Sequence, residues 1–177
     1  TSPTPSRNGG DNYAYGGALS SLDVTETVLI FFTFTLPAAT SQIFDFLGDV
    51  NNIVDPNGLY TFSIGGNDII GAGEALSTNP SGAELAAAEQ EMMNIAGSLE
   101  VALQQWLDDF DGAGEGRIVI LNAPNVGITP RAIADGKEVV FEALSIAYNQ
   151  GLSDVVDSLN DPRLLLVDFY ELTNMAV

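Results

Sequence analysis

Three short apolar runs, separated by helical patterns, constrain this chain more than any other feature of its sequence. They are residues 59–64, Arg117–Leu121 and Leu164–Val167. The second run is continuously apolar after its first residue, which is typical of a strand covered on both faces of a sheet. Strands that alternate with helices are joined by right-handed crossovers, so the order predicts an α/β fold with three layers, α/β/α, around a mostly parallel sheet.

Three helices are expected around these strands. The first covers residues 41–53, and the last covers residues 133–159 with apolar side chains near the helical spacing of 3.6 residues. Between them, Ser81 and Glu84 form a capping-box pattern that opens a long helix. Its apolar positions recur every seven residues, at Leu85, Met92, Leu99 and Trp106. This spacing predicts one buried stripe along the helix.

The amino-terminal part of the chain is less regular. Residues 1–12 are rich in Pro, Gly, Ser and Asn and are expected to form a loop. Residues 25–36 are rich in Thr, Val, Ile and Phe and predict a single strand that ends at Pro37. No internal repeat is evident, and the length fits one domain. We therefore expect residues 1–177 to form a single domain.

The charge balance of the chain excludes several classes of partner. It has 24 acidic and 5 basic residues, a net charge of −19. Such a surface repels phosphate backbones, so nucleic acid is not an expected partner. The longest apolar stretch, residues 28–39, is too short to span a bilayer. The chain contains no Cys, which excludes disulfides and thiolate chemistry, and we expect no metal or other cofactor.

The candidate chemistry lies at the end of the first apolar run, where Gly65, Gly66, Asn67 and Asp68 follow. Open α/β sheets bind ligands at the carboxyl ends of their strands. Asn67 would place a carboxamide N–H there, and such a donor can stabilise an oxyanion. A turn closed by the Asn67 side chain is the simpler interpretation of the same four residues. A second glycine-bearing segment, residues 12–18, could present a backbone N–H to the same point.

Five segments together resemble the GDSL esterases and lipases, also called SGNH hydrolases. Residues 12–18, Asn-Tyr-Ala-Tyr-Gly-Gly-Ala, look like the second sequence block of that family. Residues 62–69 contain Gly-Gly-Asn-Asp and look like its third block, Gly-x-Asn-Asp. The pattern continues in order over residues 122–130, 147–152 and 166–170. The resemblance implies a flavodoxin-like SGNH hydrolase fold, incomplete at both ends.

The resemblance also implies roles for individual residues. Gly17 matches the glycine that lends its backbone N–H to an oxyanion hole, and Asn67 matches the residue that supplies a side-chain N–H. The third donor in this family is the backbone N–H of the nucleophile, while Asp68 is expected to brace its loop. The implied substrate is a carboxylic ester of a small molecule or lipid. The resemblance implies a secreted or cell-surface protein. The acidity of the chain and its lack of Cys point the same way.

The chain departs from the family pattern at the nucleophile and at the base. It contains no Gly-Asp-Ser-Leu tetrapeptide and no His. A serine alkoxide needs a base within hydrogen-bond reach, and Ser20, Ser21 and Ser63 have no imidazole to serve them. The sequence begins at Thr1 and shows no signal peptide. We therefore expect the central segment of a longer esterase, inactive by itself, with Ser and His outside residues 1–177.

Two other functions stay open. One is a non-catalytic acidic binding or interaction domain that keeps the fold without the chemistry, and flanking sequence without both missing motifs would favour it. The other is a phosphate-ester hydrolase on a similar sheet. That enzyme would need a metal cluster or a basic clamp, and the sequence shows neither. The sequence leaves the oligomeric state open.

Overall fold

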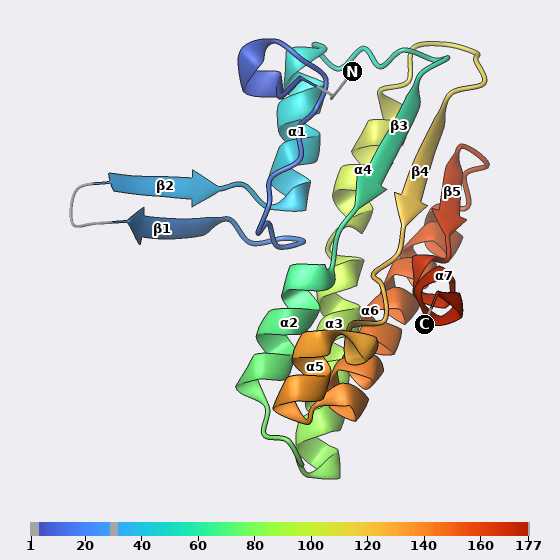
Figure 1. Cartoon of the computed structure of the whole chain (residues 1–177). Helices are drawn as coiled ribbons and strands as arrows, with labels where there is room; N and C mark the ends of the chain where they lie inside the picture. The colour runs from blue at the N-terminus through green and yellow to red at the C-terminus, as the bar shows by residue number, and fades with distance from the viewer. Residues whose placement is uncertain (1–3, 29–31, 177) are drawn as a thin grey trace.

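The computed structural model of the chain describes residues 4–28 and 32–176. Their centre is a parallel sheet of three strands in the order β3–β4–β5 (Figure 1). The strands are β3 (Leu59–Ser63), β4 (Arg117–Leu121) and β5 (Leu164–Val167). Leu59 lies opposite Arg117, and Ile118 lies opposite Leu164. The α/β class and all three predicted strands are confirmed, with β3 one residue shorter than expected.

Helices connect the strands and cover the sheet. They are α1 (Ala39–Asp49), α2 (Gly66–Ala75), α3 (Gly82–Gly97), α4 (Glu100–Asp108), α5 (Pro130–Asp135), α6 (Glu138–Leu159) and α7 (Phe169–Met175), with the 3-10 helices η1 (Ser6–Asn8) and η2 (Val126–Ile128). The chain passes from β3 to β4 through α2, α3 and α4, and from β4 to β5 through η2, α5 and α6. Helices α4 and α6 lie behind the sheet, while α2, α3 and α5 gather beyond the carboxyl ends of its strands (Figure 1).

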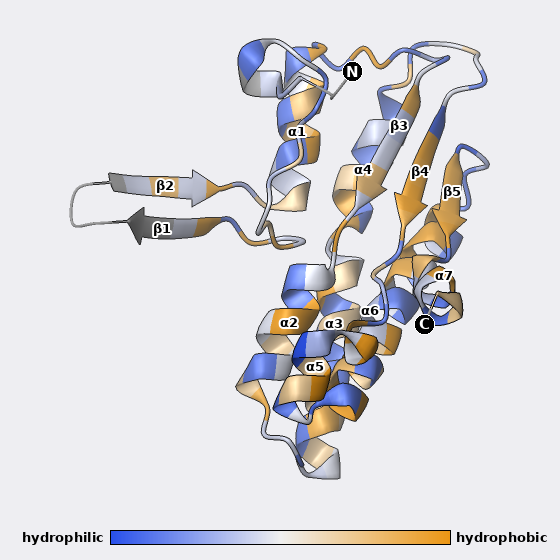
Figure 2. Cartoon of the chain, viewed as in Figure 1, coloured by the Kyte–Doolittle hydropathy of each residue, from blue (hydrophilic) through white to orange (hydrophobic). Residues whose placement is uncertain are grey.

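One face of the sheet holds the core. Ile118 and Ile120 of β4 are fully buried there, and Tyr60 of β3 packs on the Trp106 ring of α4 with ring centroids 5.5 Å apart. On the opposite face the alternate side chains of β4 are half-buried and those of β3 are exposed. Figure 2 shows β4 and β5 as mostly hydrophobic strands and β3 as mixed. Burial on both faces, predicted for Arg117–Leu121, is therefore complete on one face and partial on the other.

Two predicted helices are each divided in two. The capping box at Ser81 is present, since Glu84 N–H donates to Ser81 Oγ and Ser81 N–H donates to Glu84 Oε2. The helix that it opens is interrupted at Ser98, whose hydroxyl donates to a carbonyl one turn earlier, and the buried stripe continues across the break. Gly136, with φ 62°, separates α5 from α6 because this left-handed conformation ends a helix.

The segments Val24–Val28 and Phe32–Leu36 are the two strands of a hairpin, so the prediction of one strand over residues 25–36 is wrong. Strands β1 (Val24–Val28) and β2 (Phe32–Leu36) pair antiparallel, with Thr25 opposite Thr35. The hairpin projects away from the rest of the chain (Figure 1). Folding back gives the backbone N–H and C=O groups partners that a lone strand would lack. The part of the predicted strand over residues 29–31 lies outside the described residues.

A groove follows the edge of β3 that faces away from β4. Within the described residues β3 pairs with β4 alone, and Leu59 is 72% exposed. The groove has a volume of about 820 Å³, and its other wall is formed by α1 and residues 11–15. It extends from Gly58 to Ile64 and reaches Ala18. The free edge of β3 therefore opens toward the segment that carries the second predicted oxyanion donor.

Candidate active site

The turn between β3 and α2 depends on one glycine. Gly65 has φ 105° and is the N-cap of α2. A Cβ at this position would lie 2.6 Å from Cζ of Tyr148, so both the backbone conformation and the close approach require glycine. Helix α2 then begins at Gly66. Asn67 therefore lies in the first turn of a helix that was not predicted from the sequence.

Asn67 links α2 to the segment that contains Gly17. Its Nδ2 donates to the carbonyl of Ala18 at 2.9 Å, so its side chain does not close the local turn that the simpler interpretation required. Gly17 has φ 87°, and its N–H has no hydrogen-bond partner within residues 4–28 and 32–176. Asn67 and Gly17 are both exposed, and a carboxamide has a second N–H to offer. That the two residues share one acceptor stays a prediction.

Asp68 faces the interior of the protein and binds Ser20, which lies in the same segment as Gly17 and Ala18. Both of its carboxylate oxygens accept from Ser20 N–H at 3.2 Å, and Oδ2 accepts from Ser20 Oγ at 2.9 Å. Ser20 Oγ also lies 2.7 Å from the hydroxyl oxygen of Tyr148 on α6. Ser20 and Tyr148 are fully buried, and Asp68 is 7% exposed. Asp68 therefore has a structural role, as expected, but it holds the segment that contains Ser20 and not a loop of its own.

The electrostatics of this buried cluster determine which groups carry protons. Burial raises the pKa of the Asp68 carboxyl, although the hydrogen bonds from Ser20 lower it in part. Burial also raises the pKa of the Tyr148 hydroxyl, and the Asp68 charge raises it further. Tyr148 therefore stays protonated and donates to Ser20 Oγ, since the Ser20 proton points at Asp68. Ser20 is thus buried and fully engaged, which leaves it unavailable as a nucleophile.

Asparagines join the carboxyl ends of β4 and β5. Asn122 Nδ2 donates to Asp168 Oδ1 at 3.1 Å, and Asn122 Oδ1 accepts from Tyr170 N–H at 2.9 Å. Asn149 both donates to and accepts from the backbone of Ala123 at 2.9 Å. Sequence reasoning did not assign roles to these asparagines. The available signal was the position of Asn122, a polar residue directly after a buried strand.

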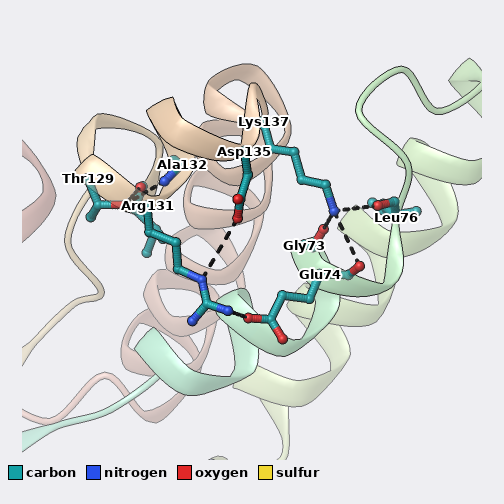
Figure 3. A network of polar contacts seen from close by, with 9 residues as sticks. Gly73, Glu74, Leu76, Thr129, Arg131, Ala132, Asp135 and Lys137 are labelled. Atoms are coloured by element: carbon teal, nitrogen blue, oxygen red, sulfur yellow. Dashed lines mark hydrogen bonds and ion pairs between the residues drawn. The ribbon is translucent and has the colours of Figure 1, made fainter.

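The far end of α2 is held by a lysine. Lys137 Nζ donates to the carbonyl oxygens of Gly73, Glu74 and Leu76 at 2.9, 3.3 and 2.6 Å (Figure 3). Glu74 also pairs with Arg131 (Figure 3). A cation is favourable at the carboxyl end of a helix because unpaired carbonyls and the helix dipole gather there. Both ends of the helix that carries Asn67 are therefore anchored.

Within residues 4–28 and 32–176, no group of three or more Asp or Glu side chains is arranged to hold a metal ion. None of the helices in that part of the chain is both long and apolar enough to cross a membrane.

Known proteins resemble this chain over most of its length. The family described as GDSL-like Lipase/Acylhydrolase matches residues 2–176. Lipase 1 of Photorhabdus luminescens is 32% identical over 126 residues. That alignment covers 71% of this chain and 16% of the relative, so the chain corresponds to a small part of the relative's length. The family resemblance inferred from the sequence is confirmed.

Proposed function

Because this chain belongs to the GDSL-like lipase/acylhydrolase family, we propose that it forms the oxyanion-binding part of a carboxylic ester hydrolase. In this proposal the Gly17 N–H and one Asn67 side-chain N–H bind the oxygen that becomes negative as an ester carbonyl is attacked. The observation that carries the proposal is the 2.9 Å hydrogen bond from Asn67 Nδ2 to Ala18, the residue next to Gly17. It supports a common location for both donors at the carboxyl end of β3.

The environment of these donors suits a developing negative charge. Asn67 lies in the first turn of α2, where unpaired N–H groups and the helix dipole favour anions. Gly17 N–H has no partner within the described residues, so it would bind an oxyanion without breaking an existing bond. The net charge of −19 repels anionic substrates, so neutral esters of small molecules or lipids are the expected class.

The nucleophile and the general base would come from residues outside the 177-residue chain. Ser20 is buried in hydrogen bonds, and the chain contains no His. In the proposed reaction a serine Oγ attacks the ester carbonyl while a histidine accepts its proton. The histidine then returns the proton to the departing alcohol, and water hydrolyses the acyl-enzyme by the same steps. Residues 1–177 alone would be inactive.

A non-catalytic domain with the same fold is the alternative. The engaged Ser20 and the lack of His in this chain favour it as the second candidate. Flanking sequence distinguishes the two, since a pseudoenzyme would lack both a nucleophilic serine motif and an Asp-x-x-His motif. We also propose that the protein acts outside the cell or at its surface, with its acidity and its lack of Cys as the supporting features.

The experiment uses a protein that includes the flanking residues and measures hydrolysis of p-nitrophenyl butyrate. Asn67→Ala should lower kcat by about 10²–10³ while KM changes little, because the lost donor acts on the transition state. Asn94→Ala is the matched control, since Asn94 is an exposed asparagine on α3, and it should leave both constants unchanged. An unchanged kcat for Asn67→Ala would show that Asn67 does not bind the oxyanion and would contradict the proposal.

A further inference from the structure

Two hydrogen-bonded links join the same two segments of chain. On the exposed side, Asn67 donates to Ala18, and on the buried side, Ser20 donates twice to Asp68. Asn67 and Asp68 are neighbours in the first turn of α2, and Ala18 and Ser20 are separated by one residue. A single link would leave the segment free to swing about it, whereas two adjacent links define both its distance from α2 and its orientation.

Tyr148 connects this pair of links to a third element. Its hydroxyl oxygen lies 2.7 Å from Ser20 Oγ, and its ring lies so close to Gly65 that a Cβ there would overlap it. Gly65 is the N-cap of α2. One fully buried side chain from α6 therefore contacts both the start of α2 and the segment that carries Gly17.

The cluster contains a buried carboxylate whose hydrogen bonds all come from neutral groups. Its partners are the N–H and O–H of Ser20, and among the described side chains none of Arg117, Arg131, Lys137 and Arg163 forms an ion pair with it. Burying a carboxyl group in this way costs stability compared with an apolar side chain of similar size. Buried polar networks in which every group is satisfied specify one geometry. The cluster is therefore explained better by the geometry that it imposes than by the stability that it adds.

We propose that Ser20, Asp68 and Tyr148 are positioning residues, which hold the Gly17 backbone N–H and the Asn67 carboxamide at the separation that one oxyanion requires. This inference rests on the proposed function. None of the three side chains touches the substrate. They act through the two donors, and their loss changes the placement of those donors.

The first test is a double-mutant cycle on the protein with its flanking residues, with p-nitrophenyl butyrate as substrate. Asp68→Asn should lower kcat by about 10- to 100-fold, with a smaller change in KM, because misplaced catalytic groups lose transition-state binding. In an Asn67→Ala background the same Asp68→Asn change should lower kcat by a smaller factor, because only the Gly17 donor is then left to be misplaced. Equal losses in both backgrounds would overturn the inference, because Asp68 would then act independently of Asn67.

Tyr148→Phe provides a second variant that keeps the ring packed against Gly65 and removes only the hydroxyl. It should lower kcat by roughly tenfold and show the same dependence on Asn67. Ser145→Ala is the matched control, because Ser145 is also a fully buried hydroxyl on α6 and bonds to Val126 N–H and the Phe141 carbonyl instead. Ser145→Ala should reduce stability and leave kcat unchanged. A loss of kcat for Ser145→Ala equal to that for Tyr148→Phe would assign both effects to general destabilisation and overturn the inference.

The second test does not depend on activity. In the same protein labelled with ¹⁵N-asparagine, the two proton shifts of the Asn67 side-chain amide should be separated more widely than those of the exposed Asn94, because one Asn67 proton is bonded to Ala18. Asp68→Asn and Tyr148→Phe should move these shifts toward each other, and unchanged shifts would overturn the inference. If the shifts move but Asn67→Ala leaves kcat unchanged, the positioning is supported and the proposed function is wrong.

Discussion

Replacement of Gly65 by alanine is the sharpest test of how the chain builds the turn under β3. Gly65 has φ 105°, a conformation that L-residues avoid, and an added Cβ would lie 2.6 Å from Tyr148 Cζ and 2.8 Å from Cδ1. The backbone term costs about 1–2 kcal/mol. Forcing the buried ring to move adds about 1–3 kcal/mol. We therefore expect Gly65→Ala to lower the free energy of unfolding by about 2–5 kcal/mol, a large part of the roughly 5–15 kcal/mol typical of a domain.

The assay is urea unfolding of the 177-residue chain, followed by far-UV circular dichroism. Gly71→Ala is the matched control in the same helix, because a Cβ there meets nothing within 4 Å and its φ is not positive. Alanine is the better helix former, so this control should raise the free energy of unfolding by about 0.5–1 kcal/mol. If Gly65→Ala and Gly71→Ala have the same stability, the close approach of Tyr148 to the turn is wrong.

Three further predictions concern the charged groups and the serines. The pKa of Asp68 is raised by burial, so between its unfolded and folded pKa values the folded chain binds more protons and stability falls as pH rises. Urea midpoints from about pH 4 to about pH 8 should therefore fall more steeply with pH in the wild type than in Asp68→Asn, and parallel curves would contradict this. Lys137→Met removes three hydrogen bonds from the end of α2 and should cost about 1–2 kcal/mol in urea unfolding. Arg131→Met, which breaks a more exposed ion pair, should cost less than about 1 kcal/mol, and equal losses would argue against the capping role of Lys137. The 177-residue chain should not react with a fluorophosphonate probe, since Ser20 is engaged and the chain contains no His; stoichiometric labelling detected by mass spectrometry would show otherwise.

The sequence correctly predicted the elements that depend on residues close to one another in the chain. Strand β4 follows from one continuous apolar run, and the start of α3 follows from Ser81 and Glu84, which bond to each other. Helix α2 was missed because its glycines lower helix propensity. Its stability comes instead from buried Ile69 and from Lys137, which lies more than 60 residues further along the chain.

The hairpin was missed for a different reason. The threonines of β1 and β2 are arranged symmetrically, with Thr25 opposite Thr35 and Thr27 opposite Thr33, but the sequence between the strands has none of the usual turn residues. An apolar run without Gly, Pro, Asn or Asp predicts a continuous strand. Symmetry of the residue types was the signal that could have identified two paired strands.

The candidate active site was also predicted only in part from the sequence. The Gly-Gly-Asn-Asp tetrapeptide and its likeness to a family block located Asn67, and the structure brings it to the residue next to Gly17. No local pattern could show that Ser20 is buried, because its partners Asp68 and Tyr148 lie 48 and 128 residues away. Contacts across such separations are decided by packing of whole elements, so serine alone could be interpreted as a nucleophile or as structure.

The proposed chemistry depends most on two N–H groups that bind one oxygen. The most direct measurement is a crystal structure of the protein with its flanking residues after reaction with a fluorophosphonate, whose phosphoryl oxygen occupies the position of the oxyanion. We predict that both Gly17 N and Asn67 Nδ2 lie about 2.7–3.1 Å from that oxygen. A phosphoryl oxygen bound by neither group, or by only one of them, would contradict the proposal.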